Sequence, residues 1–287
     1  MTTTEGTSEV LVGLRPGRAR RSRRVFVALV GRDLTVLGHN LKQFLPGTIV
    51  QPLLLVFVFT YVFPRIGLGI GAGTGASSIE VGAGRFSTLF VPGLVAQSII
   101  FVGVFSVGLN LVRELDSAEL DDMVLAPAPV AVVAYAKVAA GAVQALAAAT
   151  MVFPVAALVP STPVDLSPDW LVLATVLPLS CVASAALGLT LGTLFRARSA
   201  NWLVSMVAVP LSFLGATFYS WGMLEPIPWL KYAILVNPLV YVSEGLRGGL
   251  SGDTPHMSLA AVYLALVAAT AVFTRLGVRG FRRRVLS

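Results

Sequence analysis

No group of residues in this sequence has the spacing of a known nucleotide, metal or hydrolase site. A phosphate-cradling loop needs Gly-x-x-x-x-Gly-Lys-Ser/Thr, but Lys42, Lys137 and Lys231 each follow leucine or alanine. The two histidines, His39 and His256, lie far apart and offer no ligand spacing. Gly-x-Ser-x-Gly and His-Glu-x-x-His motifs are missing. We therefore expect no catalytic residue, no cofactor site and no metal site in this chain.

Two local patterns resemble chemical sites without meeting their requirements. The glycine run from Gly67 to Gly75 never satisfies Gly-x-Gly-x-x-Gly and lies between two apolar segments, which favours a flexible loop. Asp121 and Asp122 are adjacent acids, but no histidine or arginine constellation accompanies them to hold a metal or a phosphate. An integral membrane enzyme that modifies lipids is kept as an alternative reading, although its catalytic constellation is missing.

Composition places the chain in a membrane. Of its 287 residues, 56% are hydrophobic and 12% are charged, and its mean hydropathy is +0.83. Soluble domains carry about 25% charged residues, so a soluble globule of this composition would expose more apolar surface than it could bury. The single cysteine, Cys181, excludes an internal disulfide.

Apolar segments long enough to cross a bilayer occur six times. A crossing helix needs about 20 residues, and we predict an all-α protein with six transmembrane helices. The predicted spans are approximately residues 45–64, 87–112, 131–159, 170–195, 200–220 and 258–278. We divide the chain into a basic tail (1–23), an amphipathic helix (24–44), a six-span domain (45–278) and a second basic tail (279–287).

The distribution of lysine and arginine predicts the orientation, because short cytoplasmic loops collect these residues. With the N-terminus inside, 17 of the 21 basic residues fall on the inner side. The four on the outer side are Arg65, Arg85, Lys231 and Arg247. We therefore expect a multi-pass protein with both termini in the cytoplasm.

The basic cluster from Arg15 to Arg24 has two other readings. Nucleic-acid binding is disfavoured because no aromatic residues are interleaved for stacking, and a nearby membrane explains the charge through anionic lipid. A twin-arginine export signal at Arg23 and Arg24 is disfavoured because Arg32 interrupts the apolar run that follows. We interpret the cluster as a topology anchor that contacts membrane lipid.

The segment after this cluster is predicted to be an amphipathic helix lying in the membrane interface. Its apolar residues recur at spacings of three and four, which places them on one face: Phe26, Val30, Leu34, Leu37, Leu41 and Phe44. A helix packed on a soluble domain is the alternative, but the chain contains no obvious soluble domain.

Polar groups inside the predicted spans are almost all neutral. The amides are Gln51, Gln97, Asn110 and Gln144, which could line a pathway or hold helices together. Ion-coupled transporters usually carry an ionisable group in the membrane. Energy is therefore expected from a partner on the cytoplasmic side rather than from a proton relay in this chain.

Two motifs accompany the predicted interfacial helix and six spans. The first reads Arg113-Glu114-Leu115, then Leu120-Asp121-Asp122-Met123 through Pro127, with Lys137 following. The second reads Asn237-Pro238-Leu239-Val240-Tyr241, with Glu244 and Arg247 after it. With these motifs the chain resembles the type-2 permeases of ABC transporters, a family that includes drug, nodulation-factor and polysaccharide exporters. One departure is Ser117, near the position where the family usually has a glycine.

The resemblance implies a membrane subunit of a bacterial plasma-membrane exporter that works as a dimer, with a second copy or a paralogue. ATP and Mg²⁺ would be held by a separate cytoplasmic ABC ATPase. The first motif would form a coupling helix, with Arg113, Glu114, Leu120, Asp121 and Met123 facing that ATPase; an ordinary solvated loop is the alternative. Drug, lipid and glycan substrates all remain open, as does a non-transporting assembly subunit.

The second motif belongs to the segment 221–257, whose apolar stretches are too short to cross a membrane. Its family residues are Asn237, Pro238, Tyr241, Glu244 and Arg247. Tryptophans and prolines in the same segment are typical of short re-entrant or interfacial helices before the last span. A simple exposed loop would instead leave apolar residues such as Leu239 and Val242 facing water.

Overall fold

Helices make up most of the computed structural model of this chain. The structure describes residues 18–39, 50, 53–55, 57–62, 83–115, 129–158, 166–195, 209–252 and 254–286. Within these ranges there is no β-strand, only an isolated bridge between Ser167 and Ser251. The prediction of an all-α chain is therefore confirmed for the described residues.

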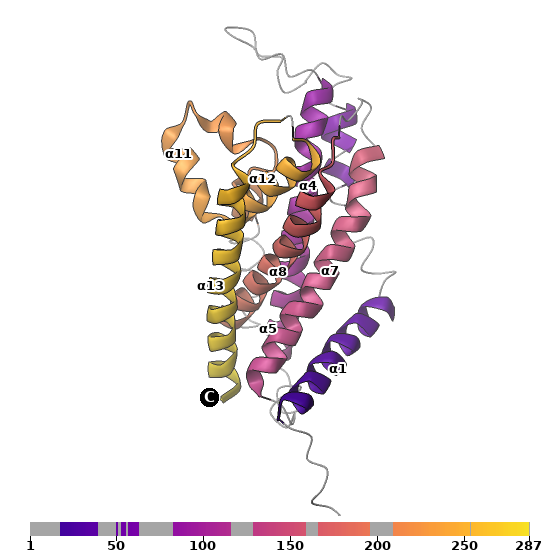
Figure 1. Ribbon diagram of the computed structural model, residues 1–287, viewed down its shortest axis with the longest axis vertical. Helices are drawn as coiled ribbons and strands as arrows, with labels where there is room; N and C mark the ends of the chain where they lie inside the picture. The colour runs from indigo at the N-terminus through magenta and orange to yellow at the C-terminus, as the bar shows by residue number, and fades with distance from the viewer. Residues whose placement is uncertain are drawn as a thin grey trace, which may run out of the picture.

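Four helical segments in the described part of the chain are long and apolar enough to cross a membrane. The first is continuous through three elements, α4 (Ala83–Val102), the π-helical η2 (Gly103–Leu109) and α5 (Asn110–Leu115). The others are α7 (Val130–Leu158), α8 (Trp170–Leu194) and α13 (Leu259–Leu286). Figure 1 shows them side by side as an elongated bundle.

These four helices match four of the six predicted spans in position. The helix α13 continues eight residues beyond the predicted end at 278, because its last turns, rich in arginine, remain packed through Phe281 and Val285. Of the predicted span 45–64, only parts are described, including the π-helical η1 (Phe57–Val62). The six-span count therefore stays a prediction.

The predicted span 200–220 ends earlier than we expected. The structure describes this segment from residue 209, and α10 (Val209–Phe213) stops seven residues short of 220. Ala216 then has a φ of 52°, a left-handed conformation that ends a helix. The following carbonyl groups turn toward the interior of the bundle, where Arg247 binds those of Ala216 and Thr217.

Close backbone contact between α8 and η2 forms the centre of the bundle. A Cβ atom on Gly188 would lie 2.1 Å from the carbonyl oxygen of Gly103, and one on Gly192 would lie 2.8 Å from that of Gly108. Small residues allow helices in membranes to approach this closely, which increases their van der Waals contact. The glycines therefore set the distance between these two helices.

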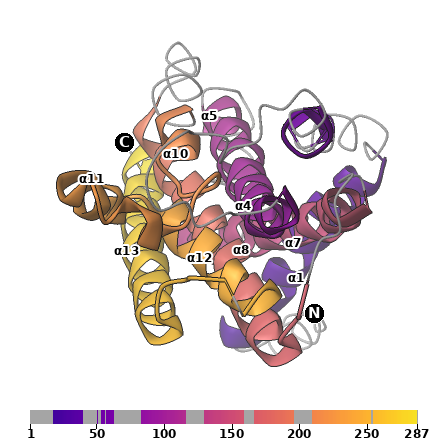
Figure 2. The ribbon, with the colours of Figure 1, turned by 90° about the horizontal axis from the view of Figure 1, so that it is seen from above.

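Burial distinguishes the central helices from the peripheral one. In the most apolar window of each segment, 83% of Thr88–Leu115 is buried inside the protein, but only 11% of Leu259–Val285. Figure 2 shows α13 at the edge of the bundle when it is viewed along its length. Before its arginine-rich last turns, α13 exposes large apolar side chains such as Leu264 and Val267, as expected for a surface that faces lipid.

The two ends of the bundle differ in structure. At one end, which we call the α12 end, lie four short elements: η5 (Trp221–Leu224), α11 (Pro228–Ala233), η6 (Ile234–Val236) and α12 (Pro238–Leu250). At the other, the α1 end, α1 (Arg18–His39) lies obliquely against α7 (Figure 1). The α1 end also contains the start of α7 and the end of α13.

The helix α1 begins earlier than the predicted start at residue 24, and residues 40–44 lie outside the described ranges. Phe26, Val30 and Leu34, which we placed on the apolar face, are half-buried. Leu29 packs against a cluster that includes Leu111, Val133 and Phe281 of other helices. The apolar face of α1 is therefore in contact with the bundle.

Candidate functional site

The segment 221–257 forms short helices, and two fully buried charges hold them in place. Arg247 and Glu244 both have exposed fractions of 0%. The Nη1 atom of Arg247 donates to Oε1 of Glu244 over 2.7 Å. Burial lowers the pKa of the Arg247 guanidinium, and the Glu244 carboxylate opposes that shift. Two adjacent opposite charges satisfy each other in an interior that could tolerate neither one alone.

The same two side chains connect four separate parts of the chain. Glu244 accepts hydrogen bonds from the backbone N–H groups of Trp221 and Met257, each over 2.8 Å. Arg247 donates to the carbonyl oxygens of Ala216, over 2.6 Å, and Leu89, over 3.3 Å. The pair therefore joins α4, the turn after α10, η5 and the segment before α13.

The rest of the outer-segment motif builds the helix that carries this pair. The Asn237 side chain accepts from the N–H of Leu239 as the N-cap of α12, and Pro238 occupies the first turn. The Nδ2 atom of Asn237 also donates to the carbonyl oxygen of Leu211. The hydroxyl of Tyr241 donates to the carbonyl of Leu235 over 2.8 Å. Four of the five motif residues singled out from the sequence therefore form side-chain hydrogen bonds around α12, and the fifth, Pro238, begins that helix.

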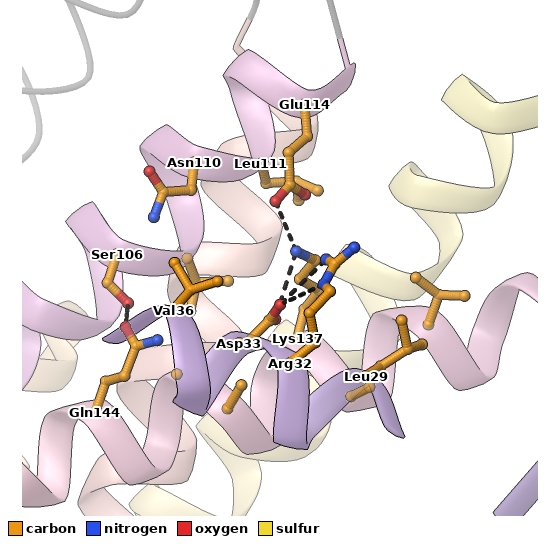
Figure 3. A pocket seen from close by; sticks show the side chains of 15 residues that line it. Leu29, Arg32, Asp33, Val36, Ser106, Asn110, Leu111, Glu114, Lys137 and Gln144 are labelled. Atoms are coloured by element: carbon orange, nitrogen blue, oxygen red, sulfur yellow. Dashed lines mark hydrogen bonds and ion pairs between the residues drawn. The ribbon is translucent and has the colours of Figure 1, made fainter. Parts of the chain in front are cut away.

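At the α1 end, a chain of charges joins three helices. Lys137 of α7 lies 2.7 Å from Glu114 of α5 and 3.5 Å from Asp33 of α1, measured from Nζ to the nearest carboxylate oxygen. Asp33 also pairs with Arg32 over 3.1 Å. Figure 3 shows the four side chains converging from their helices. The side chains of Lys137, Asp33 and Glu114 are 11–18% exposed, whereas Arg32 is 55% exposed.

These charges line a cavity of about 510 Å³. Polar side chains continue into it from the charged end toward the middle of the bundle: Asn110, Ser106 and Gln144. The hydroxyl of Ser106 donates to Oε1 of Gln144. Leu29, Val36 and Val107 supply apolar wall. We call the cavity's charged residues (Arg32, Asp33, Glu114 and Lys137) the charged tier and its neutral polar residues (Asn110, Ser106 and Gln144) the neutral polar tier. The remaining wall is apolar.

The predicted coupling residues are only partly described. Arg113 is exposed at the end of α5, whereas Glu114 is engaged by Lys137 of the same chain. Leu120, Asp121 and Met123 lie outside the described residues. Contact of Glu114 with an ATPase, which we expected, stays a prediction, but its carboxylate already has an intramolecular role that the sequence alone did not reveal.

The predicted intramembrane amides have different surroundings. Asn110 and Gln144 both line the cavity. Gln97 is 5% exposed in α4, and its Oε1 atom has no hydrogen-bond partner among the described residues. Gln51 lies outside the described ranges. The structure therefore brings two of these four amides together.

The sequence analysis did not identify Asp33, Arg32 and Ser106 as site residues. The helical spacing of α1 placed Asp33 away from the apolar face, which made it an ordinary solvated charge. Ser106 lies in η2, where the wider π-helical turn changes which residues share a face. A regular helical projection over this segment cannot give the correct facing residues.

Long apolar helices, a helix lying across one end and a buried ion pair at the other define a helical membrane-embedded protein. The family model of the ABC-2 type transporter matches residues 24–251. The chain belongs to this family, as its two motifs indicated.

Curated relatives agree with this membership. The chain is 27% identical over 187 residues to the inner membrane transport permease YadH of Escherichia coli (strain K12). The alignment covers 64% of this chain and 71% of that permease. The permeases of the same name from Escherichia coli O157:H7 and Shigella flexneri match with the same identity and coverage.

Proposed function

We propose that this chain is the membrane subunit of an ATP-driven exporter in a bacterial plasma membrane, powered by a separate cytoplasmic ABC ATPase. The observation that carries the proposal is the match to the ABC-2 transporter family over most of the chain. The sequence contains no phosphate-binding lysine loop, so the nucleotide and Mg²⁺ belong to the partner. The likeness to an inner membrane transport permease supports the same location.

The proposed arrangement in the membrane has six spans and both termini in the cytoplasm. The α1 end then faces the cytoplasm, because Arg113, Lys137 and the arginines at the end of α13 gather there. In this orientation α1 lies in the inner interface and the short helices of the α12 end lie in the outer leaflet. The 13-residue α12 is too short to span, which supports a re-entrant position.

The coupling segment proposed from residues 113–125 begins in the last turn of α5. Because Glu114 is tied to Lys137, a push on this segment would reach α7 and α1 through the ion pairs rather than through α5 alone. A dimer with a second copy or a paralogue completes the proposed transporter. An amphipathic drug, a lipid and a glycan remain candidate substrates.

Co-purification tests this assignment. The tagged chain is expressed with its ABC ATPase, extracted in mild detergent and purified through the tag. We expect the ATPase to co-purify with the wild-type chain, and Leu120→Asp to lose it while membrane abundance stays unchanged. Retention of the ATPase by Leu120→Asp would contradict the coupling segment. Absence of any ABC ATPase from the wild-type preparation would contradict the function.

A further inference from the structure

We infer that the cavity between α1, α5 and α7 binds the polar head of a zwitterionic amphiphile, a molecule with one phosphate and one amine on an acyl-glycerol body. The inference rests on the proposed function in one respect, which is that α1 lies at the inner membrane interface. At that depth an amphiphile would have its head group level with the charged tier of the cavity.

The charged tier favours a head group of zero net charge. It contains two cations, Arg32 and Lys137, and two anions, Asp33 and Glu114, joined in one chain of ion pairs. A purely anionic head would add net negative charge to a tier that is neutral without it, next to the carboxylates of Asp33 and Glu114, which are only 16% and 18% exposed. A zwitterion can exchange contacts with both signs at once, and its binding keeps the tier neutral.

The neutral polar tier lies deeper in the bundle, where the ester linkages of such a molecule would reach. Gln144 is seven residues after Lys137 on the same face of α7, a rise of about 10 Å at 1.5 Å per residue. Asn110 and Ser106 face the same cavity from α5 and η2. The exposed amide of Asn110 can donate to and accept from a bound molecule.

The wall and size of the cavity fit the same class of ligand. Its volume of about 510 Å³ falls within the roughly 300–1,000 Å³ that small-molecule sites occupy. Apolar parts of the cavity wall come from α1, through Leu29 and Val36, and from η2 and α7, through Val107 and Val133. Val36 is 52% exposed, so the acyl chains can leave along α1 into the surrounding bilayer.

Binding can be measured on the full chain without its ATPase, so a failed transport assay does not affect the result. The chain is purified in dodecyl maltoside and titrated with phosphatidylethanolamine that carries a fluorophore on an acyl chain. We expect saturable binding, displaced by unlabelled phosphatidylethanolamine at least tenfold more effectively than by phosphatidylglycerol. Soluble phosphoethanolamine, which lacks the acyl-glycerol body, should compete at least tenfold more weakly than the intact lipid.

Substitutions locate this binding in the cavity. Asn110→Leu and Arg32→Gln should each weaken binding about three- to tenfold, as expected for the loss of one hydrogen bond or one charged contact. Two control variants lie outside the cavity: Arg23→Gln on α1, the helix of Arg32, and Thr150→Leu on α7, a residue whose hydroxyl donates to its own helix. Both should bind like the wild type.

Three results would overturn the inference. They are non-saturable partitioning that is the same in all variants, equal competition by phosphatidylglycerol, and equal competition by phosphoethanolamine.

A further experiment distinguishes a transported lipid from one that stays bound. Once saturable binding in the cavity is established, ATP-driven transfer of the bound analogue to the opposite leaflet in proteoliposomes with the ATPase identifies a cargo lipid, and an unchanged distribution identifies a resident lipid.

Discussion

The Nη1 atom of Arg247 lies 2.7 Å from Oε1 of Glu244, and neither side chain is exposed. One helical turn of α12 thus supplies both members of an ion pair to the interior of the bundle. Their remaining hydrogen-bonding atoms bind backbone groups from α4 to the segment before α13. The pair holds the short helices of the α12 end on the long ones.

Removing one member of this pair should be strongly destabilising. Arg247→Ala leaves the Glu244 carboxylate buried without its cation, and the loss of a buried partner costs about 3–5 kcal/mol. The pair Lys231–Glu225, 3.6 Å apart, provides the control because its carboxylate partner, Glu225, is 78% exposed. Glu225→Ala should cost less than about 1 kcal/mol. Thermal unfolding in detergent measures both, and equal melting temperatures for the two variants would refute a structural role for Arg247.

The glycine contact between α8 and η2 should not tolerate a methyl group. A Cβ on Gly188 would lie 2.1 Å from a backbone oxygen, and backbone cannot rotate away as a side chain can. Gly188→Ala should therefore lower the melting temperature. Gly31→Ala in α1, where a Cβ would meet nothing within 4 Å, should leave it unchanged or raise it, because alanine favours a helix. An unchanged melting temperature in Gly188→Ala would mean that the helices are not this close.

Lys137 should control how tightly α1 is held against α7. Lys137→Met removes the cation shared by Glu114 and Asp33. Spin labels on cysteines at Gly31 and Tyr135, in a Cys181→Ala background, report the distance between the helices. We expect a broader distance distribution in Lys137→Met than in the wild type.

Arg32→Met is the matched control for this experiment. Arg32 forms its ion pair within α1 itself, with Asp33, so its removal should leave the distance distribution narrow. Broadening in Arg32→Met equal to that in Lys137→Met would show that the general charge of α1, rather than the Lys137 bridge, holds the helix.

Cysteine labelling in intact cells tests the proposed orientation. Cys181 is 1% exposed, so the unmodified chain should give little background. A cysteine at Gly252, exposed at the α12 end, should react with an impermeant maleimide added outside. A cysteine at Arg282, exposed near the end of α13, should react only after the cells are permeabilised. The opposite pattern would invert the topology.

The sequence predicted the long helices well because their apolar runs exceed the length of a crossing and end at polar or helix-breaking residues. Asp169, which caps α8 by accepting from the N–H groups of Leu171 and Val172, marks such an end. The run from 200 to 220 was misleading, because apolar character continues past Phe213 while the backbone turns at Ala216. Hydropathy cannot detect that turn, since the residues after it are buried in protein.

The sequence identified several residues of the candidate site but not the contacts that these residues make. The spacing of Asn237, Glu244 and Arg247 was recognisable, but Arg247 binds the carbonyl of Leu89, 158 residues away. The Lys137–Asp33 contact depends on how α1 docks on α7. Such contacts depend on tertiary packing, which local periodicity does not encode.

Hydrolysis of ATP in proteoliposomes tests the central claim most directly, which is that this chain is the membrane subunit of a transporter powered by another protein. The rates to compare are those of the chain alone, the ABC ATPase alone, their complex, and the complex carrying Leu120→Asp. We predict no hydrolysis by the chain alone, the highest rate in the wild-type complex, and a return to the rate of the ATPase alone in the variant. Specific ATP hydrolysis by the purified chain, or a complex no faster than its ATPase, would contradict the account.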